Sequence, residues 1–224
     1  MDDLTVHKLL NLSSHVSKYC VGMEGNISGK YEDRILIKAS GTKLSTLSRN
    51  DLVEYDFFGE QKSSLDKKGS MELSFHTYLL GFEGINFVSH THPTNVLKVL
   101  CSHEGYAFAN RRIFPDQVIF NGKKSCLVPY AKPGDELTKK IKKHVNSFME
   151  KEGYLPRLIL LENHGIICCG NTVEECVIMT EICDKSAEIW VGSKSLSDVK
   201  FLTDEQVNEL VEDKNEKYRK ELLK

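Results

Sequence analysis

The segment of residues 157–170, RLILLENHGIICCG, restricts the possible folds more than any other part of the chain. Apolar residues lie on both sides of a short polar interruption, and a glycine follows the histidine of that interruption. An apolar run of this kind favours a β-strand, and the interruption predicts a break or bulge at His164 and Gly165. Because glycine lets a backbone turn sharply, we expect a kink in the sheet that re-aims one histidine side chain.

A second β-prone segment, INFVSHTHP at residues 85–93, carries two more histidines and is stopped by Pro93. Side chains alternate between the faces of a strand, so His90 and His92 are predicted to point to the same side, with Thr91 opposite. An isolated H-x-H pair is more often two unrelated histidines than a metal site. The pair therefore indicates a site only together with a third ligand.

The remaining patterns predict helices and further strands. Helical spacing is found at residues 4–19, 71–82, 135–151 and 172–190, and short strands are indicated at residues 34–40 and 125–130. The strand at 34–40 runs into a glycine turn at Gly41 and indicates an early hairpin. Ser70 stands where a helix N-cap would, which places Glu72 in the first turn of the helix that follows. Residues 203–224 are predicted to form a polar C-terminal helical tail.

Length and charge limit the classes of protein. The chain has 224 residues, a length that one mixed domain routinely occupies, so we expect a single domain over residues 1–224. A formal net charge of −2 offers no positive field that would gather nucleic acid. No apolar run approaches the roughly 20 residues that cross a bilayer, and the acidic start differs from a signal peptide. We expect a cytoplasmic protein with no nucleic-acid and no membrane partner.

The seven cysteines are odd in number and include no C-x-x-C pair. This pattern argues against a disulfide framework and against a cysteine zinc site, so reduced thiols are expected. Cys168 and Cys169 lie in the apolar run IICCG and are interpreted as small core residues.

Three histidines together suggest a metal centre. If His164 at the strand break joins His90 and His92, three imidazoles would bind zinc and leave one coordination position open. That arrangement is typical of catalytic zinc, whereas structural zinc is closed by four ligands. A carboxylate nearby, Glu72, would complete a reactive centre.

Five short motifs resemble those of the class II aldolase/adducin family. They are GN at Gly25 and Asn26, SG at Ser40 and Gly41, SME at residues 70–72, HTHP at residues 90–93, and NHG at residues 163–165. They occur in the family's order, and the match extends over roughly residues 4–190. The resemblance implies an α/β fold of three layers, α/β/α, with a mixed, largely antiparallel central sheet. It also implies a homotetramer.

Carried over position by position, the resemblance implies that His90, His92 and His164 bind one zinc ion and that Glu72 is the catalytic carboxylate. It implies substrate contacts, chiefly to a phosphate, from Gly25, Asn26, Ser40, Gly41, Ser70 and Met71. Glycine turns, hydroxyls and a helix N-terminus are suitable phosphate donors.

The chain departs from the family pattern at two places. Met71 stands where fuculose-phosphate aldolase has a second serine. The region of Pro115 and Asp116 stands where that enzyme has a catalytic tyrosine, which leaves the proton donor to the aldehyde oxygen unassigned.

The resemblance implies a zinc-dependent aldolase for a ketose 1-phosphate of the L-fuculose or L-rhamnulose type. The products would be dihydroxyacetone phosphate and a small aldehyde such as L-lactaldehyde. Two alternatives in the same family are an L-ribulose-5-phosphate 4-epimerase, which carries aspartate at the position of Glu72, and a methylthioribulose-1-phosphate dehydratase. An alternative without catalysis is an adducin-like interaction domain, although such domains lack the metal ligands.

His76 lies one helical turn after Glu72, at the spacing of side chains that share a helix face. It could brace Glu72, yet an ordinary helix histidine is the simpler interpretation.

Overall fold

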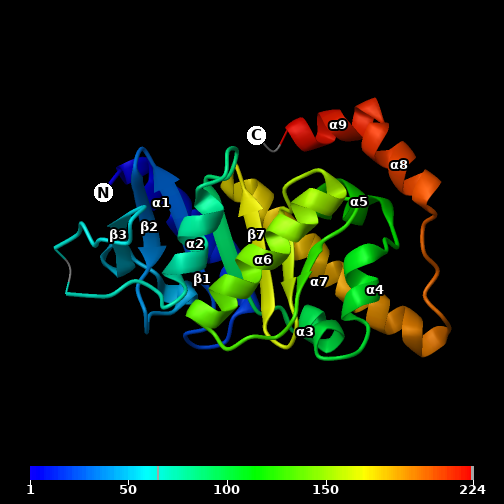
Figure 1. Ribbon diagram of the computed structural model, residues 1–224, viewed down its shortest axis with the longest axis horizontal. Helices are drawn as coiled ribbons and strands as arrows, with labels where there is room; N and C mark the ends of the chain where they lie inside the picture. Colours follow the sequence, from blue (N-terminus) through cyan, green and yellow to red (C-terminus); the bar gives the residue numbers. More distant parts are fainter. Residues whose placement is uncertain (65, 223–224) are drawn as a thin grey trace.

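The computed structural model describes residues 1–64 and 66–222, whose strands form one seven-stranded sheet between helices (Figure 1). The strands are Asn26–Tyr31 (β1), Arg34–Lys38 (β2), Leu52–Asp56 (β3), Phe87–Thr91 (β4), Cys126–Val128 (β5), Leu158–Leu161 (β6) and Gly165–Gly170 (β7). Their order across the sheet is β3-β2-β1-β4-β7-β6-β5.

Neighbouring strands are antiparallel except β5 and β6, which are parallel. The predicted mixed, largely antiparallel sheet is therefore confirmed. An early hairpin is present, formed by β1 and β2, but its turn lies at Glu32 and Asp33 and not at Gly41, which follows β2. In the centre of the sheet, Asn26 of β1 pairs with His90 of β4, and His90 pairs with Ile167 of β7. Directly paired residues share a face of the sheet, so this register places Asn26 beside His90.

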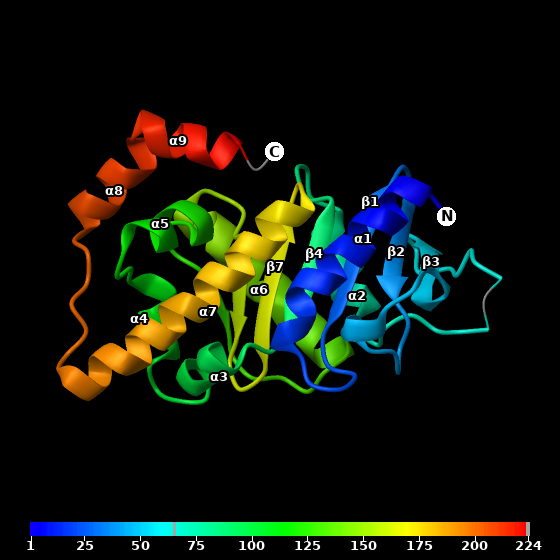
Figure 2. The same cartoon turned by 180° about the vertical axis from the view of Figure 1, so that it is seen from behind.

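Helices cover both faces, which confirms the three layers. α1 (Asp3–Val16), α3 (Thr94–Leu100) and α7 (Val173–Leu196) pack on one face, seen from the front in Figure 2, and α2 (Leu73–Leu80) and α6 (Asp135–Glu152) pack on the other. Alternate residues of β6 serve the two cores: Leu158 and Leu160 pack with α1 and α7, and Ile159 and Leu161 pack with α2 and α6. Such a strand is apolar along its whole length because both of its faces are buried.

Residues 157–170 correct our expectation of one broken strand. The segment forms two antiparallel strands, β6 and β7, joined by a tight turn over residues 162–164. Asn163 takes up the left-handed conformation of the turn, with φ +54°. Gly165 was expected to allow the sharp turn, but it is needed for close packing. A Cβ there would lie 2.5 Å from the Thr91 carbonyl oxygen and 2.7 Å from Cδ2 of His92.

The predicted helix start at Ser70 is also corrected. α2 begins at Leu73 with Glu72 as its N-cap residue, so Glu72 precedes the first helical turn. The Ser70 hydroxyl accepts the N–H of Glu72 at 3.3 Å, and the Ser70 carbonyl oxygen accepts the N–H of Leu73 at 3.0 Å. Ser70 therefore forms a turn that leads into the helix.

Several short elements were not assigned from the sequence. They are β3, α3, α4 (Gly105–Asn110), α5 (Pro115–Asn121) and three 3-10 turns at Ser17–Tyr19, Leu44–Thr46 and Arg49–Asp51.

The predicted tail consists of two helices, α8 (Asp204–Glu212) and α9 (Lys214–Glu221), which pack against α5. Extended backbone at Asp213 separates them. Residues 223 and 224 of that prediction lie outside the described residues.

The seven cysteines all lie within the described residues and are free thiols, as expected. Cys168 and Cys169 are buried core residues, and burial raises the pKa of Cys168 to about 12. Among the described residues, no helix combines the length and the apolar character that a membrane crossing requires.

Candidate metal centre

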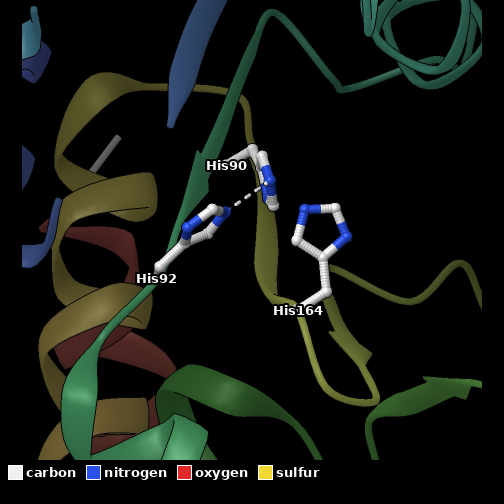
Figure 3. A group of neighbouring side chains, drawn as sticks. All are labelled: His90, His92 and His164. Carbon is white, nitrogen blue, oxygen red and sulfur yellow. Dashed lines mark hydrogen bonds between the residues drawn. The ribbon is translucent and has the colours of Figure 1, made fainter. Parts of the chain in front are cut away.

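Three histidines from two parts of the chain converge at one end of the sheet (Figure 3). His90 is on β4, His92 follows that strand, and His164 ends the turn between β6 and β7. Their ring centroids lie 4.8–5.1 Å apart, and one nitrogen of each ring lies within 4.8 Å of the others. The predicted common face of His90 and His92 is therefore present, and a group of this shape could hold a metal ion.

The backbone fixes the orientation of His90. Its side chain is 1% exposed, and its Nδ1 lies 2.9 Å from the carbonyl oxygen of Ile166 on β7. A carbonyl oxygen only accepts, so Nδ1 carries the hydrogen and Nε2 carries the lone pair. Nε2 of His90 lies 3.0 Å from Nε2 of His92, so both nitrogens face the same point. A histidine held in this way is ready to act as a metal ligand.

All three rings are neutral at neutral pH. Burial, the main cause in each case, lowers the pKa of His90, His92 and His164 to about 4. For His92 and His164 the proximity of His90 lowers the pKa further, although nearby carboxylates oppose the shift. Only a neutral imidazole offers a lone pair, so the electrostatic environment suits metal binding.

Glu72 lies directly beside these rings and is 5% exposed. One carboxylate oxygen, Oε2, lies 3.5 Å from Nε2 of His90, and the other, Oε1, lies 3.8 Å from Nε2 of His164. The turn formed by Ser70 places this carboxylate between α2 and the end of β4. Glu72 can therefore reach a substrate atom bound next to the three imidazoles.

These groups line a pocket of about 370 Å³, and the pocket brings together all ten residues singled out from the sequence: Gly25, Asn26, Ser40, Gly41, Ser70, Met71, Glu72, His90, His92 and His164. Gly25 adopts φ +68°, and a Cβ there would lie 2.7 Å from the carbonyl oxygen of His90. Only glycine therefore lets the start of β1 approach the histidine strand so closely.

Asn26 has buried partners that the sequence did not reveal. Its Nδ2 donates a hydrogen bond of 2.8 Å to Oε2 of Glu72, and its Oδ1 contacts Nε2 of His76. One N–H of the amide is thus used to hold the carboxylate, and the second is available to a ligand. Met71 also lines the pocket but is 71% exposed.

Two further residues line the pocket, Met23 and Lys38. Lys38, on β2, is only 2% exposed, and burial lowers the pKa of its ammonium group. The sequence did contain a signal for Lys38 as a site residue, namely a lysine inside the apolar run RILIKAS, close to Ser40 and Gly41. Lysines are almost never fully buried unless their charge has a partner. Outside that lining, Oε2 of Glu24 lies 3.6 Å from Nδ1 of His92.

The region that aligns with the family tyrosine lies elsewhere in the fold. Asp116 is in α5 and forms an ion pair of 3.2 Å with Arg219 of α9. No tyrosine is among the described residues that line the pocket.

Known proteins share both the sequence pattern and the fold. The family model described as Class II Aldolase and Adducin N-terminal domain matches residues 10–191. An L-fuculose phosphate aldolase of Methanococcus maripaludis is 28% identical over 176 residues, covering 77% of this chain and 86% of that protein. One of Escherichia coli is 24% identical over 195 residues, covering 85% and 84%. The solved structure of an L-fuculose 1-phosphate aldolase superimposes with a TM-score of 0.78 over 98% of both chains, at 20% identity.

Proposed function

The chain belongs to the class II aldolase and adducin family, and we propose that it is a zinc-dependent aldolase that cleaves a ketose 1-phosphate. The observation that carries the proposal is the convergence of three neutral imidazoles beside the buried carboxylate of Glu72 in one pocket. An adducin-like module without catalysis would have no need of this arrangement. The substrate proposed is of the L-fuculose or L-rhamnulose 1-phosphate type.

The donor set fits a divalent metal. His90, His92 and His164 would hold it through ring nitrogens that are neutral and face one another, and three protein ligands leave a position open. Three nitrogen ligands suit zinc well. When bound, such a metal acts as a Lewis acid on a substrate oxygen, a contribution worth several kcal/mol.

Glu72 would move the proton at carbon. Cleavage of the carbon–carbon bond leaves negative charge on the carbon next to the carbonyl group, and that carbon must then receive a proton. In cleavage the acid form of Glu72 can deliver this proton and become the carboxylate, while the hydroxyl group that turns into the aldehyde gives up its own proton, so the number of protons is conserved over the cycle. In the reverse reaction the carboxylate removes the proton from carbon. Oε2 of Glu72 is already held by Asn26, so Oε1 is the atom proposed to exchange the proton.

The other side of the pocket would bind the phosphate. Ser40 and Ser70 offer hydroxyl groups, Gly41 offers a backbone N–H in a turn, and Lys38 brings a positive charge. Backbone N–H groups in a turn and short hydroxyls bind phosphate well, and a buried ammonium group strengthens the attraction. These contacts support a phosphorylated sugar as the substrate.

A substrate panel tests the proposal. L-Fuculose, L-rhamnulose and L-ribulose phosphates would each be incubated with the zinc-loaded protein, and both released dihydroxyacetone phosphate and epimerised sugar would be measured. The proposal expects dihydroxyacetone phosphate from at least one ketose 1-phosphate. Formation of the epimer alone, from a ribulose phosphate, would assign the protein to the other reaction of the family.

A further inference from the structure

We infer that His76 is a positioning residue, which acts through Asn26 to hold the carboxylate of Glu72 in its working orientation. The inference rests on the proposed role of Glu72 and adds a residue to that site. It replaces the simpler interpretation of His76 as an ordinary helix histidine.

His76 is completely buried, yet both of its ring nitrogens have polar partners. Its Nδ1 lies 2.6 Å from the hydroxyl oxygen of Ser28, and its Nε2 contacts Oδ1 of Asn26. Ser28 and Asn26 are two residues apart on β1, so their side chains point to the same face of the sheet, toward α2. The ring stacks on Phe75, with centroids 4.6 Å apart. His76 therefore links α2 to β1.

The chemistry of the partners fixes every hydrogen in this chain of contacts. Ionised Glu72 can only accept, so the group of Asn26 that faces it at 2.8 Å must be the NH₂ group. The amide oxygen of Asn26 then faces His76, which must present an Nε2–H group to it. The Nδ1 atom of His76 is left as an acceptor, so the Ser28 hydroxyl donates to it. The donors run in one direction, from Ser28 through His76 and Asn26 to Glu72.

The direction of these hydrogen bonds determines which carboxylate oxygen of Glu72 is free. Rotating the Asn26 amide by half a turn would place two acceptors together at Glu72 and, with the Nε2–H tautomer of His76, two donors together at His76. His76 therefore keeps the Asn26 N–H on Oε2 of Glu72 and leaves Oε1 free beside His164. A catalytic group held by packed and hydrogen-bonded neighbours keeps the geometry that its reaction requires.

Two substitutions of His76 separate positioning from packing. His76→Leu fills the space but removes the N–H donor, and His76→Gln retains an amide N–H that can reach Asn26. Thr77→Val, on the same helix but bonded to the Leu73 carbonyl oxygen, is the control for damage to α2. Metal content and thermal midpoint would be measured on each preparation. We expect His76→Leu to lower kcat about 10–100-fold at unchanged metal content. His76→Gln should retain most of the wild-type kcat. Equal kcat values in the leucine variant and the wild type would overturn the inference.

A double-mutant cycle tests whether His76 acts through Asn26. In an Asn26→Ala background the ring has no amide left to orient, so adding His76→Leu should change kcat by about 2-fold or less. Full additivity of the two losses would show that His76 acts by another route and would overturn the inference.

Nitrogen NMR of the wild-type protein tests the direction of these hydrogen bonds and requires no measurement of turnover. We expect the His76 ring as a neutral Nε2–H tautomer, and Ser28→Ala and Asn26→Ala should each shift its nitrogen signals. A failure of the proposed function would show as an inactive wild type with this tautomer in place. An Nδ1–H tautomer or a charged ring would overturn the positioning role, whether or not the protein cleaves a sugar phosphate.

Discussion

The Nε2 atoms of His90 and His92 lie 3.0 Å apart and face each other across the end of β4. Because Nδ1 of His90 donates to the Ile166 carbonyl oxygen, Nε2 of His90 is an acceptor, and the hydrogen between the two rings belongs to His92. A divalent ion bound at this point would take the place of that hydrogen, and His92 would then carry its hydrogen on Nδ1, which lies 3.6 Å from Oε2 of Glu24.

The protein is expected to carry about one zinc ion per chain, since three neutral imidazoles satisfy zinc and leave one position open. His90→Ala and His164→Ala should both lose the metal in elemental analysis. His144→Ala, a substitution on α6 outside the pocket lining, is the control and should retain it. Full zinc content in the His90 and His164 variants would remove both residues from the site.

Removal of the metal should lower stability. A ligand that binds only the folded state adds about 2.7 kcal/mol at a free concentration one hundred times its Kd. Thermal unfolding with a chelator should therefore begin at a lower temperature than unfolding with added zinc, and adding zinc back should restore the midpoint. Identical midpoints under both conditions would argue against a preformed site for this metal.

The metal-free protein should lose stability as the pH falls below about 6.5, the ordinary pKa of histidine. Burial holds the pKa of His90 at about 4 and that of His76 well below its ordinary value, so in this range the unfolded chain binds protons that the folded chain does not. Stability is then present above the unfolded pKa and declines by about 1.4 kcal/mol per pH unit for His90 alone.

Urea unfolding of the metal-free protein at pH 7, 6 and 5 measures this slope. His90→Phe removes one of the titrating groups, so its stability should depend less steeply on pH than that of the wild type. An unchanged slope in the variant would show that His90 takes up its proton in the folded state.

Loss of the buried ammonium group should weaken substrate binding. Lys38→Met is expected to raise KM with a smaller effect on kcat, because a phosphate held equally in the ground and transition states contributes to binding alone. Ser40→Ala should act in the same direction. Lys30→Met, at a half-buried lysine of β1 that bonds the Leu80 carbonyl oxygen, is the matched control. Equal turnover of a free sugar and its phosphate would contradict the phosphate site.

The central strands were predictable because apolar periodicity dominates their sequences. His90 and His92 follow from the alternation of a strand, and both faces of β6 are apolar because helices bury both. The turn at residues 162–164 was mistaken for a bulge, since a two-strand hairpin and a kinked strand have the same polar interruption. Only the pairing of β6 with β7 distinguishes them.

Long-range contacts of polar residues could not be predicted from sequence spacing. His76 was placed near Glu72 by helix spacing, but its partners are Asn26 and Ser28, which lie 50 and 48 residues away. The short helices α3–α5 were missed because elements of six or seven residues show too little periodicity to be recognised.

The most direct test of the account is the substitution Glu72→Gln, with zinc content, thermal midpoint and kcat measured on one preparation. Glutamine retains the shape of the side chain but cannot exchange the proton, so the three histidines should still hold zinc while kcat falls roughly 10²–10⁴-fold. If Glu72 served only as a carboxylate at the start of α2, the change would cost about 0.3–1 kcal/mol of stability and leave kcat nearly unchanged. A normal kcat with a slightly lower midpoint would contradict the catalytic role of Glu72.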